Sequence, residues 1–250
     1  MKSQSSDRLM SIIESFLAKP NQNLSEVALA CDLEPPTAIR YLRQLVERGW
    51  LERDESTKSY MLGVALVTIG EAAQAMQPIR LRAMPYMQEI LRKFNETVNI
   101  AINSRGTVVV IDALESKRSI RRGARVGEID EWFVSSLGKS ILAYLPENEV
   151  LDLLELYPPV PKTNKTLVDV KDILAGLAEI RERGYALDDE ESEIGLKCVG
   201  VPIWSGGDRV NFALSVSGPT PRIEDRLDEI IDSLKQAANA ISSANKGGAL

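Results

Sequence analysis

The sequence of 250 residues contains no histidine and only two cysteines, Cys31 and Cys198. Without histidine, Ser-His-Asp and Cys-His catalysis are excluded, and so are the usual zinc sites. Two distant cysteines are too few for a secreted disulfide scaffold, which favours a reducing, cytoplasmic location. We therefore expect a protein that is not an enzyme and holds neither a metal ion nor a cofactor.

Long hydrophobic runs are missing as well. No apolar stretch reaches the length of about eighteen residues that a membrane helix needs, and the polar residues 1–7 do not resemble a signal peptide. Hydrophobic residues make up 44% and charged residues 26%, the balance of a soluble globular protein. Because the net charge is −6, any attraction to nucleic acid has to come from a local basic patch.

Residues 1–63 carry three helical patterns followed by a hairpin pattern. Asp7 is a candidate N-cap of the first helix, Ser25 begins the second, and Pro35 opens the third, since proline is tolerated in a first helical turn. The expected buried stripe of the third helix consists of Ile39, Leu42, Leu45 and Val46. Two short helices with a tight turn between them are typical of a helix-turn-helix.

The third helix is also expected to present a polar face to a DNA major groove. Arg40 and Arg43 lie away from the apolar stripe, with Tyr41 and Gln44 alongside. The segments 50–53 and 59–62 predict a β-hairpin, the wing, which places Arg53 and Lys58 near backbone phosphates. An ordinary solvated helix face is the alternative interpretation of these arginines.

A helical pattern from residue 64 to about residue 82 predicts a linker helix, with Leu66, Ile69, Ala73 and Met76 on one stripe. Residues 83–250 then form a second, larger domain. A helix that packs on its own domain is the alternative to a linker that takes part in dimerisation.

The larger domain contains strands whose two faces differ in bulk. Residues 97–103 alternate, and residues 107–113 are the partner strand. Two further strands are expected at residues 198–203 and 210–217. Their bulky faces carry Val199, Val201 and Ile203 in the first strand and Val210, Phe212, Leu214 and Val216 in the second. The opposite faces carry Cys198 and Gly200 in the first strand and Ser215 and Ser217 in the second. Small residues leave space, so this face predicts a concave site with a few polar groups rather than a solvated sheet surface.

Several segments in this order resemble the IclR family of transcriptional regulators. They are residues 24–28 (LSEVA), 45–53 (LVERGWLER), 60–63 (YMLG), 137–143 (LGKSILA), 184–191 (GYALDDEE), 195–203 (GLKCVGVPI) and 215–219 (SVSGP). The resemblance spans nearly the whole chain. One departure is the start of the recognition helix, where Glu34-Pro35-Pro36-Thr37 replaces a Pro-Lys-Ser-Thr-like stretch.

The resemblance implies an α+β fold, in which a winged helix-turn-helix is joined by a linker helix to a GAF-like effector-binding domain. It implies a ligand-responsive regulator that binds palindromic operators of double-stranded DNA as a homodimer or tetramer and senses a small carboxylate. Thr37 matches a further DNA-contacting position. The matching effector-binding positions are Ser136, Leu137, Gly138, Asp188, Cys198, Ser215 and Ser217.

Several effector positions also have a structural interpretation. Gly138 could serve tight packing, Cys198 could be a small core residue, and Ser217 could cap the end of a strand. Asp188 could accept from an effector hydroxyl or fix its loop. Two other functions stay open at this point. One is a GAF-like thiol enzyme that uses Cys198, although no histidine could activate it; the other is a DNA-binding protein whose second domain only mediates assembly.

Overall fold

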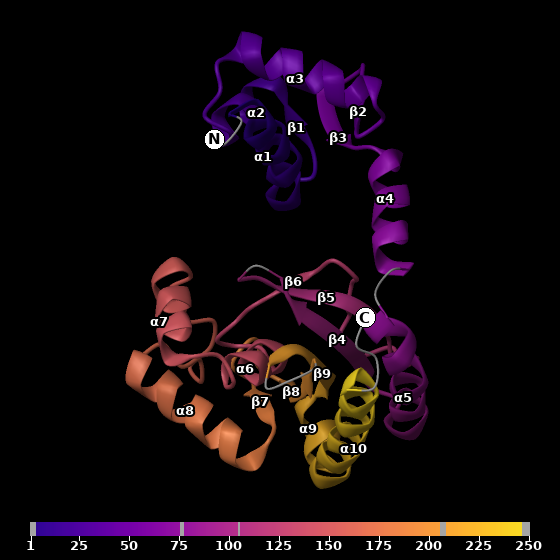
Figure 1. The fold of residues 1–250 in the computed structure, drawn as a ribbon, viewed down its shortest axis with the longest axis vertical. Coiled ribbons are helices and arrows are strands. Elements are labelled where there is room, and N and C mark those ends of the chain that lie inside the picture. Colours follow the sequence, from indigo (N-terminus) through magenta and orange to yellow (C-terminus); the bar gives the residue numbers. More distant parts are fainter. Residues whose placement is uncertain (1–3, 76–77, 105, 206–208, 247–250) are drawn as a thin grey trace. The chain divides into compact units, whose positions relative to one another are not determined.

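The computed structural model describes residues 4–75, 78–104, 106–205 and 209–246. The chain divides into two compact units, Met1–Met76 and Gln77–Leu250, which are described separately below (Figure 1). Among the described residues, no helix combines the length and apolar character that crossing a bilayer requires.

The N-terminal unit contains three helices and a small antiparallel sheet. Its helices are α1 (Gln4–Ala18), α2 (Leu24–Ala30) and α3 (Pro35–Glu47). The sheet has the order β1-β3-β2, with β1 (Gln22–Asn23), β2 (Leu51–Asp54) and β3 (Ser59–Leu62). The predicted wing hairpin is therefore confirmed, and β1 is an additional strand that the sequence did not reveal.

Local signals explain the helix starts in this unit, with one correction. Asn23 and Glu26 form a reciprocal capping box at α2, because each side chain accepts from the other residue's backbone N–H. Pro35 occupies the first turn of α3, as predicted. The expected N-cap at Asp7 is wrong, since α1 already begins at Gln4 and Asp7 lies in its first turn.

A compact core holds the N-terminal unit together. Its members are Ile12, Phe16, Val27, Tyr41, Leu42, Leu45, Leu51 and Tyr60, which contact one another across all three helices and the wing. The buried stripe of α3 runs through Ala38, Tyr41, Leu42 and Leu45, so it is rotated relative to the predicted stripe: Ile39 and Val46 are only partly buried.

Most of the helix expected over residues 64–82 is helical in the structure. Helix α4 (Val64–Ala75) precedes residues 76–77, which lie outside the described residues, and α5 (Pro78–Phe94) follows them. Met76, the last member of the predicted stripe, lies outside the described residues.

A six-stranded antiparallel sheet forms the centre of the C-terminal unit. The strands are β4 (Thr97–Asn103), β5 (Val108–Leu114), β6 (Ile129–Asp130), β7 (Ala186–Asp189), β8 (Leu196–Trp204) and β9 (Val210–Pro219). Their order is β6-β5-β4-β9-β8-β7. The predicted antiparallel sheet flanked by helices is therefore confirmed.

Helices cover both faces of this sheet (Figure 1). On one face, α5 and α10 (Leu227–Lys246) pack on Val98, Ile100, Val199, Val201, Ile203, Leu214 and Val216. On the other, α6 (Ser136–Leu142), α7 (Glu147–Leu156) and α8 (Val170–Arg183) form a second apolar cluster. The short helix α9 (Thr220–Glu224) follows β9. The bulky strand faces predicted from alternation are thus buried by helices.

One strand residue departs from the predicted alternation. Ile203 pairs with Phe212 but Trp204 pairs with Val210, which leaves Asn211 as the extra residue of a bulge. The bulge shifts the alternation, so Val210 belongs to the cluster under α6 rather than to the cluster under α10. The connecting loop 206–208 lies outside the described residues.

Candidate effector site and DNA-binding face

The small-residue face of the C-terminal sheet carries a cavity of about 50 Å³. Of the seven predicted effector positions, six line it: Ser136, Leu137, Asp188, Cys198, Ser215 and Ser217. Strand pairing brings three of these together, because Cys198 on β8 is the direct partner of Ser217 on β9, and Ser215 lies two residues before Ser217. A row of small side chains leaves the space that the cavity occupies.

Helix α6 reaches this face through two glycines. A Cβ atom on Gly200 of β8 would lie 2.4 Å from the Ser136 carbonyl oxygen, and one on Gly138 would lie 2.5 Å from the Glu131 carbonyl oxygen. Both distances are far below normal contact, so only glycine permits the observed approach. The packing interpretation of Gly138 thereby gains support.

The backbone N–H of Gly138 is already engaged at the start of α6. Its N–H donates to the Ser135 side chain at 2.9 Å, because Ser135 is the N-cap of this helix. The Gly138 amide is therefore occupied and not open to a carboxylate. The N–H groups of Ser136 and Leu137 make no hydrogen bond within the described residues.

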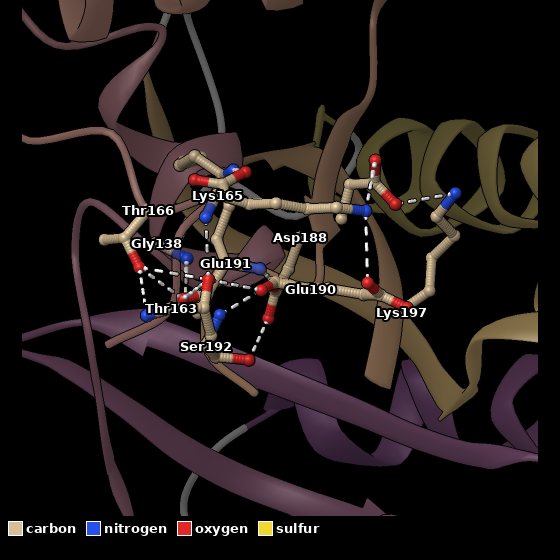
Figure 2. A network of polar contacts seen from close by, with 12 residues as sticks. Gly138, Thr163, Lys165, Thr166, Asp188, Glu190, Glu191, Ser192 and Lys197 are labelled. Carbon is tan, nitrogen blue, oxygen red and sulfur yellow. Dashed lines mark hydrogen bonds and ion pairs between the residues drawn. The ribbon is translucent and has the colours of Figure 1, made fainter. Parts of the chain in front are cut away.

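Asp188 lines the cavity but is committed to its own turn, as Figure 2 shows. Its Oδ1 accepts from the backbone N–H groups of Glu191 and Ser192 at 2.9 and 3.1 Å, and its Oδ2 accepts from the Ser192 hydroxyl. Three donors occupy most of the accepting capacity of one carboxylate. Of the two roles considered for Asp188, the contacts therefore favour fixing the loop.

The same turn is tied to neighbouring elements by ion pairs and hydroxyl groups (Figure 2). Glu191 is paired with Lys139 of α6, and both side chains are about nine-tenths buried. Lys165 binds Glu190 at 3.1 Å, and Lys197 bridges Asp189 and Glu224 at 2.8 and 2.7 Å. The wall of the cavity formed by residues 188–192 is therefore braced from three sides.

The thiol of Cys198 is poorly suited to chemistry. Burial raises its pKa far above the ordinary value, and the nearby Asp188 carboxylate adds to this effect. A nucleophilic cysteine needs the opposite, a lowered pKa next to a cation or base. Cys198 is 6% exposed and packs as a small wall residue, which argues against the thiol-enzyme alternative.

The cavity wall also includes residues that were not predicted as site residues, among them Asn99, Arg122 and Asp130. Asn99 is the direct partner of Ser215 across β4 and β9, so its place on the small face was available from the alternation. Arg122 and Asp130 come from the segment between β5 and α6. The sequence shows a basic run at residues 118–125, but nothing in it indicates which arginine lines the cavity.

Specific contacts hold the segment that contains Arg122. The Thr97 hydroxyl donates to the Arg122 carbonyl oxygen at 2.7 Å. Arg222 of α9 binds both oxygens of the buried Glu96 carboxylate at 2.6 and 2.7 Å and donates to the Ile120 carbonyl at 2.9 Å. The Arg122 side chain pairs with Glu128 at 3.3 Å. This part of the cavity wall is thus fixed by the sheet and by α9.

Asp130 is the most perturbed carboxyl group in the cavity wall. Burial raises its pKa to about 6, although it accepts from the Glu131 backbone N–H at 3.0 Å and lies near Ser135. The neighbouring Glu128 also disfavours its charge, whereas Arg122 favours it. Asp130 can therefore change its charge in the physiological range of pH.

The predicted DNA-binding face of α3 is largely exposed, with one correction. Arg40, Arg43 and Gln44 are exposed and Thr37 is partly buried. Neither arginine forms an ion pair with an acidic residue that the structure describes. Tyr41 is only 3% exposed and belongs to the core; its placement on the polar face was wrong because the buried stripe passes through it.

The two cations of the wing are not independent. Arg53 and Lys58 both pair with Glu55, at 3.2 and 3.0 Å, and the Lys58 contact is the main cause of the lowered pKa of Glu55. The turn between them is fixed by Asp54, whose pKa falls to about 2 because its carboxylate accepts from Ser56 and Thr57. Glu55 thus offsets part of the positive charge of the wing.

Comparison with known families agrees with both units. Residues 71–243 match the C-terminal domain of the bacterial transcriptional regulator IclR, and residues 5–55 match the IclR helix-turn-helix domain. The chain belongs to the IclR family of bacterial transcriptional regulators. The N-terminal unit is its DNA-binding helix-turn-helix, and the C-terminal unit is its effector-binding domain; the protein is a regulator and not an enzyme.

Individual relatives align over nearly their full length. The HTH-type transcriptional regulator XynR of Escherichia coli strain K12 is 31% identical over 243 residues, which is 96% of each chain. The crystal structure of Thermotoga maritima IclR shares 31% identity and a TM-score of 0.72, and covers 96% of this chain and 98% of its own.

A second solved structure contains a bound ligand. It is an IclR homologue from Microbacterium hydrocarbonoxydans complexed with 4-hydroxybenzoate, with a TM-score of 0.82 over 98% of this chain and 100% of its own. At 22% identity the likeness establishes the common fold alone.

Proposed function

We propose that this IclR-family regulator binds a palindromic operator as a homodimer or higher oligomer and changes its affinity for DNA when a small carboxylate enters the cavity of the C-terminal unit. The observation that carries this proposal is the cavity itself. It is lined by hydroxyl, amide and guanidinium groups and by the carboxyl groups of Glu128, Asp130 and Asp188, each of which already accepts from another group of the protein. An IclR homologue complexed with 4-hydroxybenzoate supports a carboxylate as the ligand class.

The DNA side of the proposal rests on α3 and the wing. Arg40, Arg43 and Gln44 project from one exposed helix face, where guanidinium and amide groups can bind base edges and phosphates. Thr37 lies at the start of the helix, and Arg53 and Lys58 of the wing are placed for the flanking backbone. Tyr41 supports this face from beneath, with the Arg40 guanidinium 5.0 Å from its ring centre.

Dimerisation follows from the geometry of operator binding. Two recognition helices at palindromic half-sites require at least two copies of the chain. Helix α4 supports this, because its apolar residues Val64, Val67 and Ile69 are 68%, 59% and 48% exposed. Exposed apolar side chains on one helix are typical of a surface that a partner covers.

Two substitutions separate the two activities. Arg40→Ala should weaken operator binding in fluorescence anisotropy and leave the thermal shift produced by carboxylates unchanged. Ser215→Ala should reduce carboxylate affinity, by about 1 kcal/mol for one lost hydrogen bond, and leave DNA binding without ligand unchanged. Arg92→Ala and Ser243→Ala, exposed positions of the C-terminal unit, are the matched controls.

If Arg40→Ala instead weakened carboxylate binding and Ser215→Ala weakened DNA binding, the assignment of the two units would be contradicted. A thermal-shift screen of short carboxylates and sugar acids supplies the ligand for these measurements, since a bound ligand stabilises the folded state. Operator binding without a thermal shift from any of them would instead favour a C-terminal unit that only mediates assembly.

A further inference from the structure

The cavity contains a pair of polar side chains that no protein group satisfies. Asn99 and Ser215 are direct cross-strand partners on β4 and β9, and they are 6% and 1% exposed. Neither the Asn99 Oδ1 nor the Ser215 Oγ has a hydrogen-bond partner among the described residues. Both side chains line the cavity wall.

Such a pair is unfavourable unless something binds it. Buried polar groups are almost always hydrogen-bonded, and an unsatisfied one costs free energy. A purely apolar occupant of the cavity would leave both oxygens unpaired. The occupant therefore has polar atoms directed at the Asn99–Ser215 pair.

The chemistry of the pair indicates which polar atoms these are. The side-chain oxygen of asparagine only accepts hydrogen bonds, whereas the serine hydroxyl both donates and accepts. A hydroxyl group matches the two together, because it can donate to Asn99 and accept from Ser215. A keto oxygen has no proton to donate, so in the amide orientation that the structure shows it would leave the Asn99 oxygen unpaired.

The rest of the wall restricts the other end of the ligand. Arg122 is the one cationic side chain among the described lining residues, and it forms an exposed ion pair of 3.3 Å with Glu128. A carboxylate can replace Glu128 at this guanidinium. The volume of about 50 Å³ corresponds to roughly four water molecules, which limits the ligand to a short chain.

We propose that Asn99 is an effector-contacting residue that reads a hydroxyl group, and that the effector class is a short 2-hydroxy acid rather than the corresponding 2-oxo acid. This inference rests on the proposed function, namely that the cavity binds a small carboxylate. Asn99 would thus distinguish a ligand with a 2-hydroxyl group from the same ligand with a 2-keto group.

The test compares two pairs of equal chain length, lactate with pyruvate and 2-hydroxybutyrate with 2-oxobutyrate. Their affinities are measured by calorimetry and thermal shift on the full chain. We expect the hydroxy acid of each pair to bind about tenfold more tightly, as a buried polar group left unpaired predicts. Equal binding by the two members of each pair would overturn the assignment.

Substitutions locate the selectivity. Asn99→Val keeps a side chain that suits a strand but removes the amide. The hydroxy acid and the oxo acid of each pair should then bind with about equal affinity. Asn99→Ser retains a polar group and should keep part of the preference. Asn103→Val is the matched control: Asn103 lies on the same strand outside the cavity, where its oxygen accepts from the Gly106 N–H.

The possible failures are distinguishable. Unfolding curves without ligand show whether each variant folds. If Asn99→Val folds and retains the wild-type preference, Asn99 does not read the hydroxyl, although the proposed function stands. If no hydroxy acid, oxo acid or other short carboxylate binds the wild-type protein, the proposed carboxylate sensing fails together with the inference.

Discussion

Lys139 of α6 and Glu191 of the 188–192 turn form a buried ion pair whose side chains are 11% and 10% exposed. The pair joins the helix and the turn that form two walls of the cavity. Burial raises the pKa of Glu191 despite the neighbouring ammonium group, which shows how far both groups are removed from water. Removing one partner would leave the other charge buried and uncompensated.

We therefore expect Lys139→Met to reduce the free energy of unfolding by about 3–5 kcal/mol, measured by urea denaturation. The double variant Lys139→Met/Glu191→Leu should recover most of this loss, since two apolar residues can replace a buried pair. The control is Lys162→Met, which breaks the exposed pair with Glu131 and should cost less than about 1 kcal/mol. Equal losses at Lys139 and Lys162 would show that burial of the pair is unimportant.

The contact between Gly200 and the Ser136 carbonyl predicts a second effect. Gly200→Ala forces a Cβ to within 2.4 Å of a backbone oxygen, so α6 has to move away from β8. We expect a loss of about 1–3 kcal/mol in unfolding free energy and weaker carboxylate binding.

Gly176→Ala is the matched control for that substitution. Gly176 lies inside α8, and its added Cβ would approach only the Leu167 side chain, at 4.0 Å. Alanine is favoured over glycine within a helix, so this variant should gain about 0.5–1 kcal/mol. A neutral or stabilising Gly200→Ala would contradict the close approach of α6.

The raised pKa of Asp130 predicts a dependence of stability on pH. Its value of about 6 in the folded protein lies above the ordinary 3.8, so the folded state binds the proton more tightly than the unfolded state. The contribution of Asp130 to the free energy of unfolding is then most favourable below about pH 4 and is lost as the pH rises to about 6.

Asp130→Asn removes the ionisation and should make the protein more stable than wild type above about pH 6, with a difference that shrinks toward about pH 4. Thermal unfolding across this range measures it. Asp152→Asn, an exposed site on α7, is the control and should leave the pH profile unchanged. A profile of Asp130→Asn parallel to wild type would show that Asp130 does not titrate in this window.

The shared partner of the wing cations yields a prediction for DNA binding. Glu55→Gln should release Arg53 and Lys58 for phosphate contacts and strengthen binding to duplex DNA at low salt. The slope of log K against log salt concentration should become steeper by about one to two units. Glu52→Gln removes an exposed acid of β2, just before the turn that contains Glu55, and is the control. An identical gain from both variants would indicate a net-charge effect only.

Much of the fold was accessible from the sequence because it follows local periodicity. The alternation in β4, β8 and β9 identified the small face correctly, and strand pairing then brought Cys198, Ser215 and Ser217 together. Helix α3 was recognised, but its rotation was not: Tyr41 is buried in the core and Ile39 only partly, which depends on tertiary packing.

What the sequence left undecided depends on tertiary contacts. The Gly138 N–H donates to the side chain of the N-cap residue Ser135. The Asp188 carboxylate accepts from backbone N–H groups of its own turn. Arg122 lines the cavity, and its backbone is fixed there by Thr97 and by the segment that Arg222 holds.

The central claim is that DNA binding by the N-terminal unit responds to a small molecule bound in the C-terminal unit. The most direct measurement is fluorescence anisotropy of the full chain on a duplex from upstream of its own gene, at low salt, with and without lactate or 2-hydroxybutyrate. We predict saturable binding whose affinity changes with the hydroxy acid in the wild-type protein, and in Asn99→Val the same change should need about tenfold more of the hydroxy acid. Absence of binding to that duplex under all of these conditions would contradict the account.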